Sequence, residues 1–240
     1  MKIITVEDYR ELSKVSTDII GEVVKSNPTA TLGLATGCTV LGTYANLCKM
    51  YAEGNLSFKK IKTINLDEYV GLDSNDKQSY AYFMRNNLFN HVDIDPANTF
   101  IPSGVAKDLG TECKRYDSLL TSLPRDFQLL GLGSDGHIAF NEPGSPFDSR
   151  TRVVQLAKST ISDNSRFFSR IEDVPTSAIT MGIADIMSAK QLLLVASGAG
   201  KAQAVKAMVH GAVDVSCPAS ILKTHPHVTI IVDKQAASLL

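Results

Sequence analysis

The sequence lacks an excess of charge of either sign, because its 24 Lys and Arg residues nearly balance its 25 Asp and Glu residues. It has no basic surplus of the kind that marks a nucleic acid partner, and no polybasic run that would attract an anionic membrane. No run of 18 apolar residues predicts a membrane span. This balance favours a small-molecule partner, with no nucleic acid and no membrane.

A secretory signal and paired cysteine motifs are also missing. The N-terminal segment MKIITVEDYRELSKV is acidic within its first ten residues and has no long apolar core. The four cysteines, Cys38, Cys48, Cys113 and Cys217, show no CxxC spacing. We therefore expect a cytoplasmic protein whose thiols are reduced.

Apolar runs that predict strands alternate with helical patterns along the whole chain. Strands are expected at 29–35, 61–66, 99–104, 127–133, 177–182, 191–198 and 227–233, and helices at 39–54, 79–92, 110–123 and 199–211. This βα order predicts a doubly wound α/β fold of Rossmann-like type, with a mainly parallel sheet and helices on both faces. No change in composition marks a linker, so we expect one domain over residues 1–240.

The segment 143–176 departs from this regular pattern. It is polar and rich in Ser, Arg and Asp. We interpret it as a lid over a binding site, with a partly exposed strand–helix pair as the alternative.

Ligands of such sheets bind beyond the carboxyl ends of the strands, so the polar residues at four strand ends are the candidate site. At the first, a strand runs into a helix start through Thr36, Gly37, Cys38 and Thr39. Backbone N–H groups at a helix start suit an anion. No Lys follows as in a Walker loop, and a plain turn capped by Thr is the alternative.

A second candidate anion site follows the strand 191–198. Two glycines, Gly198 and Gly200, lead into a helix with Lys201 in its first turn. A cation there opposes the helix dipole, and a bound anion would remove this conflict. A surface lysine that bears a small penalty is the alternative.

The other two strand ends carry acid–base groups. Asp67 and Glu68 follow the strand 61–66, where a carboxylate can act as a general base or can belong to a solvated acidic turn. Asp135 and His137 follow the strand 127–133, and in an extended segment they would share one face. A carboxylate beside an imidazole orients it and raises its basicity.

Glu142 supplies a second carboxylate within a few residues of His137, among three nearby glycines. A loop histidine satisfied by its neighbours is the alternative to a functional group. An anion site beside acid–base groups fits one ligand class in particular, which is a sugar phosphate.

Five segments, GLATGCT, NLDEYVGL, GLGSDGHIAFNEPGS, DNSRFF and SGAGKAQA, together resemble the glucosamine-6-phosphate deaminase family, also called the glucosamine-6-phosphate isomerase family. The match covers nearly the whole chain in the expected order. The resemblance implies that glucosamine 6-phosphate and water give fructose 6-phosphate and ammonia, in amino-sugar catabolism. It implies no metal and no organic cofactor.

Carried onto this chain, the resemblance implies roles for individual residues. Asp67 is the base that transfers a proton between carbons, and burial should raise its basicity, so we expect it in a pocket. His137 opens the sugar ring, supported by Asp135 and Glu142. The phosphate contacts fall on the Thr36–Thr39 loop, Arg166 of DNSRFF and Lys201.

The chain also departs from the larger, regulated members of that family, which are hexamers activated by N-acetylglucosamine 6-phosphate. Ser145 and Arg152 match their effector-binding positions, but Pro146 replaces a second Ser and Val154 replaces a Lys. A lost charge-assisted contact costs roughly 1.5–3 kcal/mol. We therefore expect an unregulated enzyme, as a monomer or a small homo-oligomer. At Cys38 the family more commonly has Gly.

Three other functions remain open at this stage. A 6-phosphogluconolactonase has a similar DGH turn, but this chain continues with Asn141-Glu142-Pro143. A sugar-phosphate sensor of this fold would add a DNA-binding helix pair, for which the first 30 residues leave no room. A metal hydrolase could use Asp135, His137 and Glu142 as ligands. The choice between glucosamine and galactosamine 6-phosphate is not encoded in these motifs.

Overall fold

Seven strands form the central sheet of the computed structural model, which describes residues 1–240. They lie in the order β1 (Lys2–Val6), β10 (Val228–Asp233), β9 (Leu192–Ala196), β6 (Phe127–Gly131), β2 (Thr31–Leu34), β3 (Lys62–Asn65) and β5 (Thr99–Phe100). Every neighbouring pair is parallel. The α/β prediction with a parallel sheet is therefore confirmed, although β1 was not foreseen.

Helices connect and flank these strands, as parallel connections require. They are α1 (Tyr9–Ser26), α2 (Leu41–Ala52), α3 (Tyr80–Asn87), α4 (Leu109–Ser122), α5 (Lys158–Asn164), α6 (Ile183–Met187) and α7 (Ala202–His210). The helix expected at 79–92 ends earlier, at Asn87, and a short 3₁₀ turn follows it. None of the helices combines the length and the apolar character needed to traverse a lipid bilayer.

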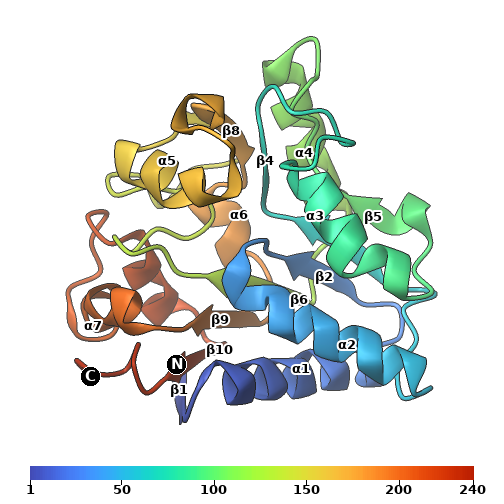
Figure 1. Cartoon of the computed structure of the whole chain (residues 1–240), viewed down its shortest axis with the longest axis horizontal. Coiled ribbons are helices and arrows are strands. Elements are labelled where there is room, and N and C mark those ends of the chain that lie inside the picture. Colours follow the sequence, from blue (N-terminus) through green and yellow to red (C-terminus); the bar gives the residue numbers. More distant parts are fainter.

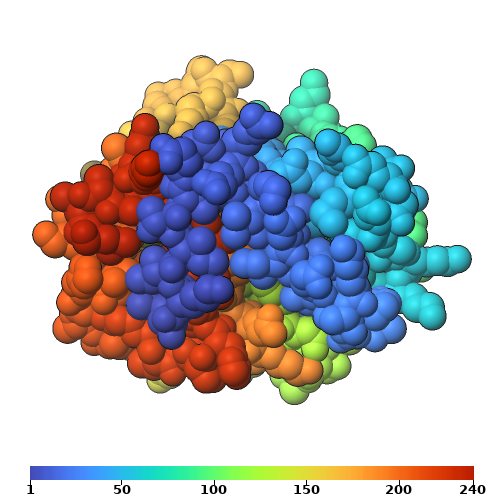
Figure 2. Space-filling model, turned by 90° about the horizontal axis from the view of Figure 1, so that it is seen from below, coloured from blue at the N-terminus to red at the C-terminus, as the bar shows by residue number.

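Helix α1 shows how local sequence sets these elements. It begins where the side chain of Asp8 accepts a hydrogen bond from the backbone N–H of Glu11, which satisfies one of the free donors of the first turn. Its apolar stripe, which includes Leu12 and Ile20, is buried against β10, β9 and α2. Figure 2 shows the N-terminal residues spread across the face seen from below, so α1 covers the sheet on that side.

A second sheet of three antiparallel strands lies apart from the first, in the order β4 (Asp67–Tyr69), β8 (Ser177–Thr180) and β7 (Arg152–Gln155). In Figure 1 this sheet and helix α5 lie above β6 and β9. The strand expected at 177–182 exists, but its place in the parallel sheet was not confirmed, since it pairs with β4 and β7 instead. Strand β7 is partly exposed and helix α5 follows it directly, so the structure has the partly exposed strand–helix pair that was the alternative for the segment 143–176.

Two hydrophobic clusters correspond to the two sheets. The main core holds 45 buried residues, whereas a cluster of four residues, Tyr69, Phe140, Leu156 and Ala178, includes side chains of the small sheet itself. Partly buried Ile161 and Phe168 of the segment 143–176 pack on this small cluster. That segment therefore has apolar support separate from the main core.

Candidate active site

Four neighbouring strands of the central sheet, β9, β6, β2 and β3, end at one cavity. Because parallel strands present their carboxyl ends at the same edge, residues far apart in sequence meet there. The lining includes eight of the predicted site residues: Thr36, Gly37, Cys38, Thr39, Asp67, His137, Arg166 and Lys201. Asp135 and Glu142, the other two predicted residues, lie behind His137 and contact its ring.

Asp67 opens strand β4 and is buried, with 6% of its surface exposed. Burial and, to a smaller extent, the negative charge of Glu68 raise the pKa of its carboxyl group to about 8, against the opposing effect of the His137 imidazole. The expectation that this carboxylate sits in a pocket is confirmed. A carboxylate with raised basicity is suited to take a proton from carbon.

Glu68 has a structural role instead, because it fixes the start of helix α3. Its side chain accepts hydrogen bonds from the backbone N–H groups of Tyr69, Tyr80 and Ala81, each at 2.9 Å. Burial raises the pKa of Glu68, and these three bonds oppose that rise. A carboxylate at a helix start is also favoured by the helix dipole. Glu68 is therefore a buried structural anchor beside Asp67.

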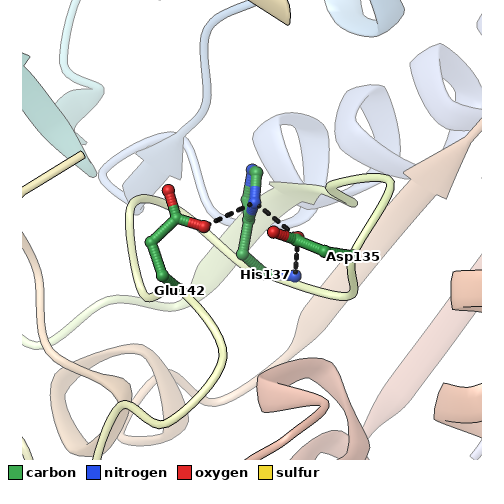
Figure 3. Close-up of side chains that lie close together, drawn as sticks. All are labelled: Asp135, His137 and Glu142. Carbon is green, nitrogen blue, oxygen red and sulfur yellow. Dashed lines mark hydrogen bonds and ion pairs between the residues drawn. The ribbon is translucent and has the colours of Figure 1, made fainter. Parts of the chain in front are cut away.

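The imidazole of His137 stands between two carboxylates, as Figure 3 shows. Its Nδ1 atom lies 2.8 Å from Oδ1 of Asp135 and 3.3 Å from Oε2 of Glu142. The same oxygen of Asp135 accepts a hydrogen bond from the backbone N–H of His137 at 3.1 Å. Both carboxylates thus approach one ring nitrogen, and they orient the ring from behind.

The backbone of this cluster is a turn, so the extended geometry expected for Asp135 and His137 was wrong. Gly136 has φ of +90°, a conformation that favours glycine, and it reverses the chain between the two residues. The N–H of Gly133 donates to the carbonyl oxygen of His137 and closes the turn. The two side chains meet because of this reversal.

The two carboxylates change the titration of the ring. Burial alone would lower the pKa of His137, but the hydrogen bonds and charges of Asp135 and Glu142 outweigh it and raise the pKa to about 9. The pKa of Asp135 moves the other way, to about 2, because the bonds and charge of His137 outweigh burial. His137 and Asp135 are therefore an ion pair at neutral pH.

Another part of the cavity lining is suited to an anion. Gly37, with φ of +106°, precedes the 3₁₀ turn Cys38–Val40, and Gly198, with φ of +92°, precedes the turn Ala199–Lys201. Burial lowers the pKa of the Lys201 ammonium. The negative charge of Asp163 opposes this decrease, and the positive charge of Arg166 adds to it. A bound anion would offset the cost of holding this cation out of water.

Arg166 reaches the cavity from the segment 143–176, beyond α5. Its guanidinium lies 4.8 Å from the ring centroid of Phe167 and is exposed to solvent. The same segment adds three lining residues that the sequence analysis missed, Thr160, Asp163 and Asn164. Asp163 and Asn164 belong to the DNSRFF motif, and their spacing from Arg166 was the available signal. Tyr80 also lines the cavity and gave no signal.

Asp135, His137 and Glu142 offer ligand atoms that lie within 4.8 Å of one another, so this cluster is the candidate metal site. One imidazole and two carboxylates form a plausible ligand set for a divalent ion. All four cysteines are free thiols, and none joins this cluster.

A parallel α/β sheet with an acid–base cluster and a cationic end at its carboxyl edge defines a class of enzymes that act on small anionic substrates. Within that class, the chain belongs to the family of glucosamine-6-phosphate isomerases and 6-phosphogluconolactonases, whose model matches residues 7–231.

Two similar proteins carry the name glucosamine-6-phosphate deaminase. The relative from Clostridium perfringens (strain 13 / Type A) is 50% identical over 241 residues and 100% of both chains. The relative from Bacillus thuringiensis (strain Al Hakam) is 50% identical over 239 residues, which cover 100% of this chain and 89% of the relative.

Solved structures show the same fold. A monomeric glucosamine-6-phosphate deaminase superposes with a TM-score of 0.99 and 47% identity over 100% of each chain. A 6-phosphogluconolactonase from Trypanosoma brucei has a TM-score of 0.82 over 100% of this chain and 98% of its own, but its 23% identity establishes the fold alone.

Proposed function

We propose that this protein is a glucosamine-6-phosphate deaminase, which converts glucosamine 6-phosphate and water into fructose 6-phosphate and ammonia. The observation that carries the proposal is the convergence of Asp67 and His137 on one cavity that also holds Arg166 and Lys201. The similar proteins at 47–50% identity support the same reaction. The protein would be a hydrolase that acts on a carbon–nitrogen bond in amino-sugar metabolism.

The proposed reaction begins with ring opening. His137, which is protonated in its ion pair with Asp135, gives a proton to the ring oxygen while the bond between C1 and the ring oxygen breaks, and it takes back the proton of the hydroxyl group on C1. Asp135 and Glu142 hold the imidazole in place and stabilise its charged form. The product of this step is the open-chain aldehyde.

Isomerisation and loss of the amine follow. Asp67 removes the proton on C2 and returns it to C1, while a second proton passes from the amino nitrogen to the oxygen on C1, so that the amino aldehyde becomes a C1 alcohol with an imine at C2. Water then adds to C2, the C2–nitrogen bond breaks, and ammonia leaves. Because the water oxygen becomes the ketone oxygen, atoms balance without a redox partner.

We propose that Thr36, Gly37, Cys38, Thr39, Arg166 and Lys201 bind the phosphate group. Backbone N–H groups at the two glycine-led turns and the Lys201 ammonium surround one end of the cavity, and Arg166 can bind phosphate in a bidentate manner. Phosphate lies far from the reacting carbons, so its binding energy serves to position them.

We also propose that residues 143–176 form a lid on the single domain. Helix α5 and the turn that carries Arg166 line one side of the cavity and pack on the small cluster around Tyr69. Ser134 donates to Asp163 at 3.2 Å, and Asn164 donates to the hydroxyl of Tyr69 at 2.9 Å. These few polar contacts would seat the lid on the rest of the molecule.

The proposal extends to regulation and assembly. We expect no activation by N-acetylglucosamine 6-phosphate, because Ser145 and Arg152 bind each other at 3.2 Å and Val154 packs on the small cluster. A monomer agrees with the monomeric deaminase that shares the fold. We propose that the protein works in the cytoplasm and needs no cofactor.

Ammonia release from glucosamine 6-phosphate tests the function. Galactosamine 6-phosphate and 6-phosphogluconolactone serve as alternative substrates in parallel assays. We expect release from the gluco compound, which must survive exhaustive chelation if Asp135, His137 and Glu142 act without a metal. Hydrolysis of the lactone without release of ammonia would overturn the proposal.

A further inference from the structure

The carboxylate of Glu142 makes contacts on two sides that belong to different parts of the molecule. Its Oε2 atom lies 3.3 Å from Nδ1 of His137. Its Oε1 atom accepts a hydrogen bond from the hydroxyl of Thr160 at 2.5 Å and a longer one from the backbone N–H of Ala157 at 3.4 Å. Ala157 caps helix α5 and Thr160 lies in its first turn, so Glu142 joins the imidazole to the lid.

The contact with Thr160 is sheltered from water. Thr160 is 4% exposed and lines the cavity, whereas its helix neighbour Ser159 is exposed. A hydroxyl that donates to a carboxylate favours the ionised form of the carboxylate and fixes its orientation. With Oε1 held by Thr160, the other oxygen of Glu142 is directed at His137.

We propose that Thr160 is a positioning residue, whose hydroxyl holds Glu142 against His137 while helix α5 is seated over the cavity. The proposal rests on the deaminase function only for its kinetic consequence. Seating of the lid would thereby complete the acid–imidazole cluster that opens the ring. Departure of α5 would release Glu142 and leave Asp135 as the only carboxylate at Nδ1.

The ionisable groups that surround the imidazole are few and come from three places. Asp135 and Glu142 lie on its own loop, and Asp67 approaches from β4. Lys201 lines the same cavity, and the negative charge of Asp135 acts on it. Of these groups, only Glu142 depends on Thr160, so removal of the Thr160 hydroxyl should change the titration of His137 through Glu142 alone.

The test compares Thr160→Val with Thr160→Ser in the full chain. Val keeps the shape and loses the donor, whereas Ser keeps the donor. NMR titration of His137 in the absence of substrate is the first readout. We expect Val to lower the pKa of His137 by at least about half a unit and Ser to leave it near the wild-type value. Ser159→Ala, on the exposed side of the same helix, is the matched control.

The kinetic arm uses the same variants. We expect Thr160→Val to lower kcat about tenfold or more with a change in KM below about twofold, and Thr160→Ser to restore kcat. In a Glu142→Gln background the Val substitution should add little, because its route through Glu142 is already lost. Thr160→Ala replaces Thr160→Val if the valine variant does not fold by circular dichroism.

The two arms separate failure of this inference from failure of the proposed function. A His137 titration that is unchanged or raised in Thr160→Val overturns the positioning role, whatever the protein catalyses. Absence of ammonia release by the wild type overturns the function, while the titration in the free protein still decides the role of Thr160.

Discussion

Gly133 lies directly against the imidazole of His137: a Cβ atom on Gly133 would be 2.3 Å from Nδ1 and 2.4 Å from Cε1 of the ring. No real side chain tolerates such distances, so the ring would have to move. We expect Gly133→Ala to shift His137 away from Asp135 and Glu142, and to lower kcat on the order of 10²-fold, since misplacement by about 1 Å has effects of that size. Steady-state ammonia release measures the change.

Gly110→Ala is the control for this substitution. Gly110 lies in the first turn of α4, away from the cavity, where an added Cβ would meet only the side chain of Asp108 at 3.2 Å. The Gly110→Ala variant should have the kcat of the wild type. If Gly133→Ala has wild-type kcat and an unchanged His137 NMR signal, the close approach has no functional meaning.

Asp67→Asn should abolish proton transfer between carbons while the fold and the phosphate end persist. We expect kcat to fall by on the order of 10²–10⁴, because Asn cannot accept the proton. Calorimetric titration with inorganic phosphate should give an affinity like that of the wild type. Asp18→Asn, on the exposed face of α1, is the control. Near-normal turnover in Asp67→Asn would refute its role as the base.

The stability of Asp67→Asn relative to the wild type should increase as the pH rises. The folded protein keeps a proton on Asp67 up to about pH 8, whereas the ordinary pKa of an Asp side chain is 3.8. The contribution of Asp67 to the free energy of unfolding is therefore complete below the pKa of Asp67 in the unfolded state. It is lost as the pH rises through the pKa of Asp67 in the folded state. The Tm difference between variant and wild type should be larger at about pH 8.5 than at about pH 5. A difference that shrinks with rising pH contradicts the raised pKa.

Most of the cavity could be predicted from the sequence because its residues follow strands. Asp67, His137 and Lys201 lie just beyond buried strands, and parallel strands place such residues at one edge. What remained unknown was that β3, β2, β6 and β9 are neighbours, which follows from the topology of the whole sheet. Strand adjacency is non-local and leaves no mark in any single segment.

The small sheet was harder to predict for a physical reason. Strand β7 is short and partly exposed, and its pairing with β8 is what makes it a strand. The turn at Gly136 was missed because alternation along an extended chain also places Asp135 and His137 together. Thr160 was missed since its partner, Glu142, belongs to a different loop.

Lys201→Gln should weaken phosphate binding with little effect on the chemical step. A charge-assisted contact contributes roughly 1.5–3 kcal/mol, so we expect the KM for the sugar phosphate to rise about 10- to 150-fold. Lys206→Gln, at an exposed position of α7, is the matched control. An effect on kcat alone would place Lys201 in the chemistry and not at the phosphate.

N-acetylglucosamine 6-phosphate should leave the kinetics unchanged, with a hyperbolic dependence on glucosamine 6-phosphate in its presence and absence. Arg152 donates to Oδ1 of Asn141 at 2.9 Å and to Oγ of Ser145 at 3.2 Å, so its guanidinium is engaged by the loop that carries Glu142. An effector phosphate would have to displace these bonds without help from a lysine at Val154.

Because Asn141 is fully buried and also donates to Ile138 and Met181, the loop is held in one arrangement without an effector. Sigmoidal rates that the effector makes hyperbolic would show that a regulatory site has survived these substitutions, and Val154→Lys is the variant in which activation should first appear.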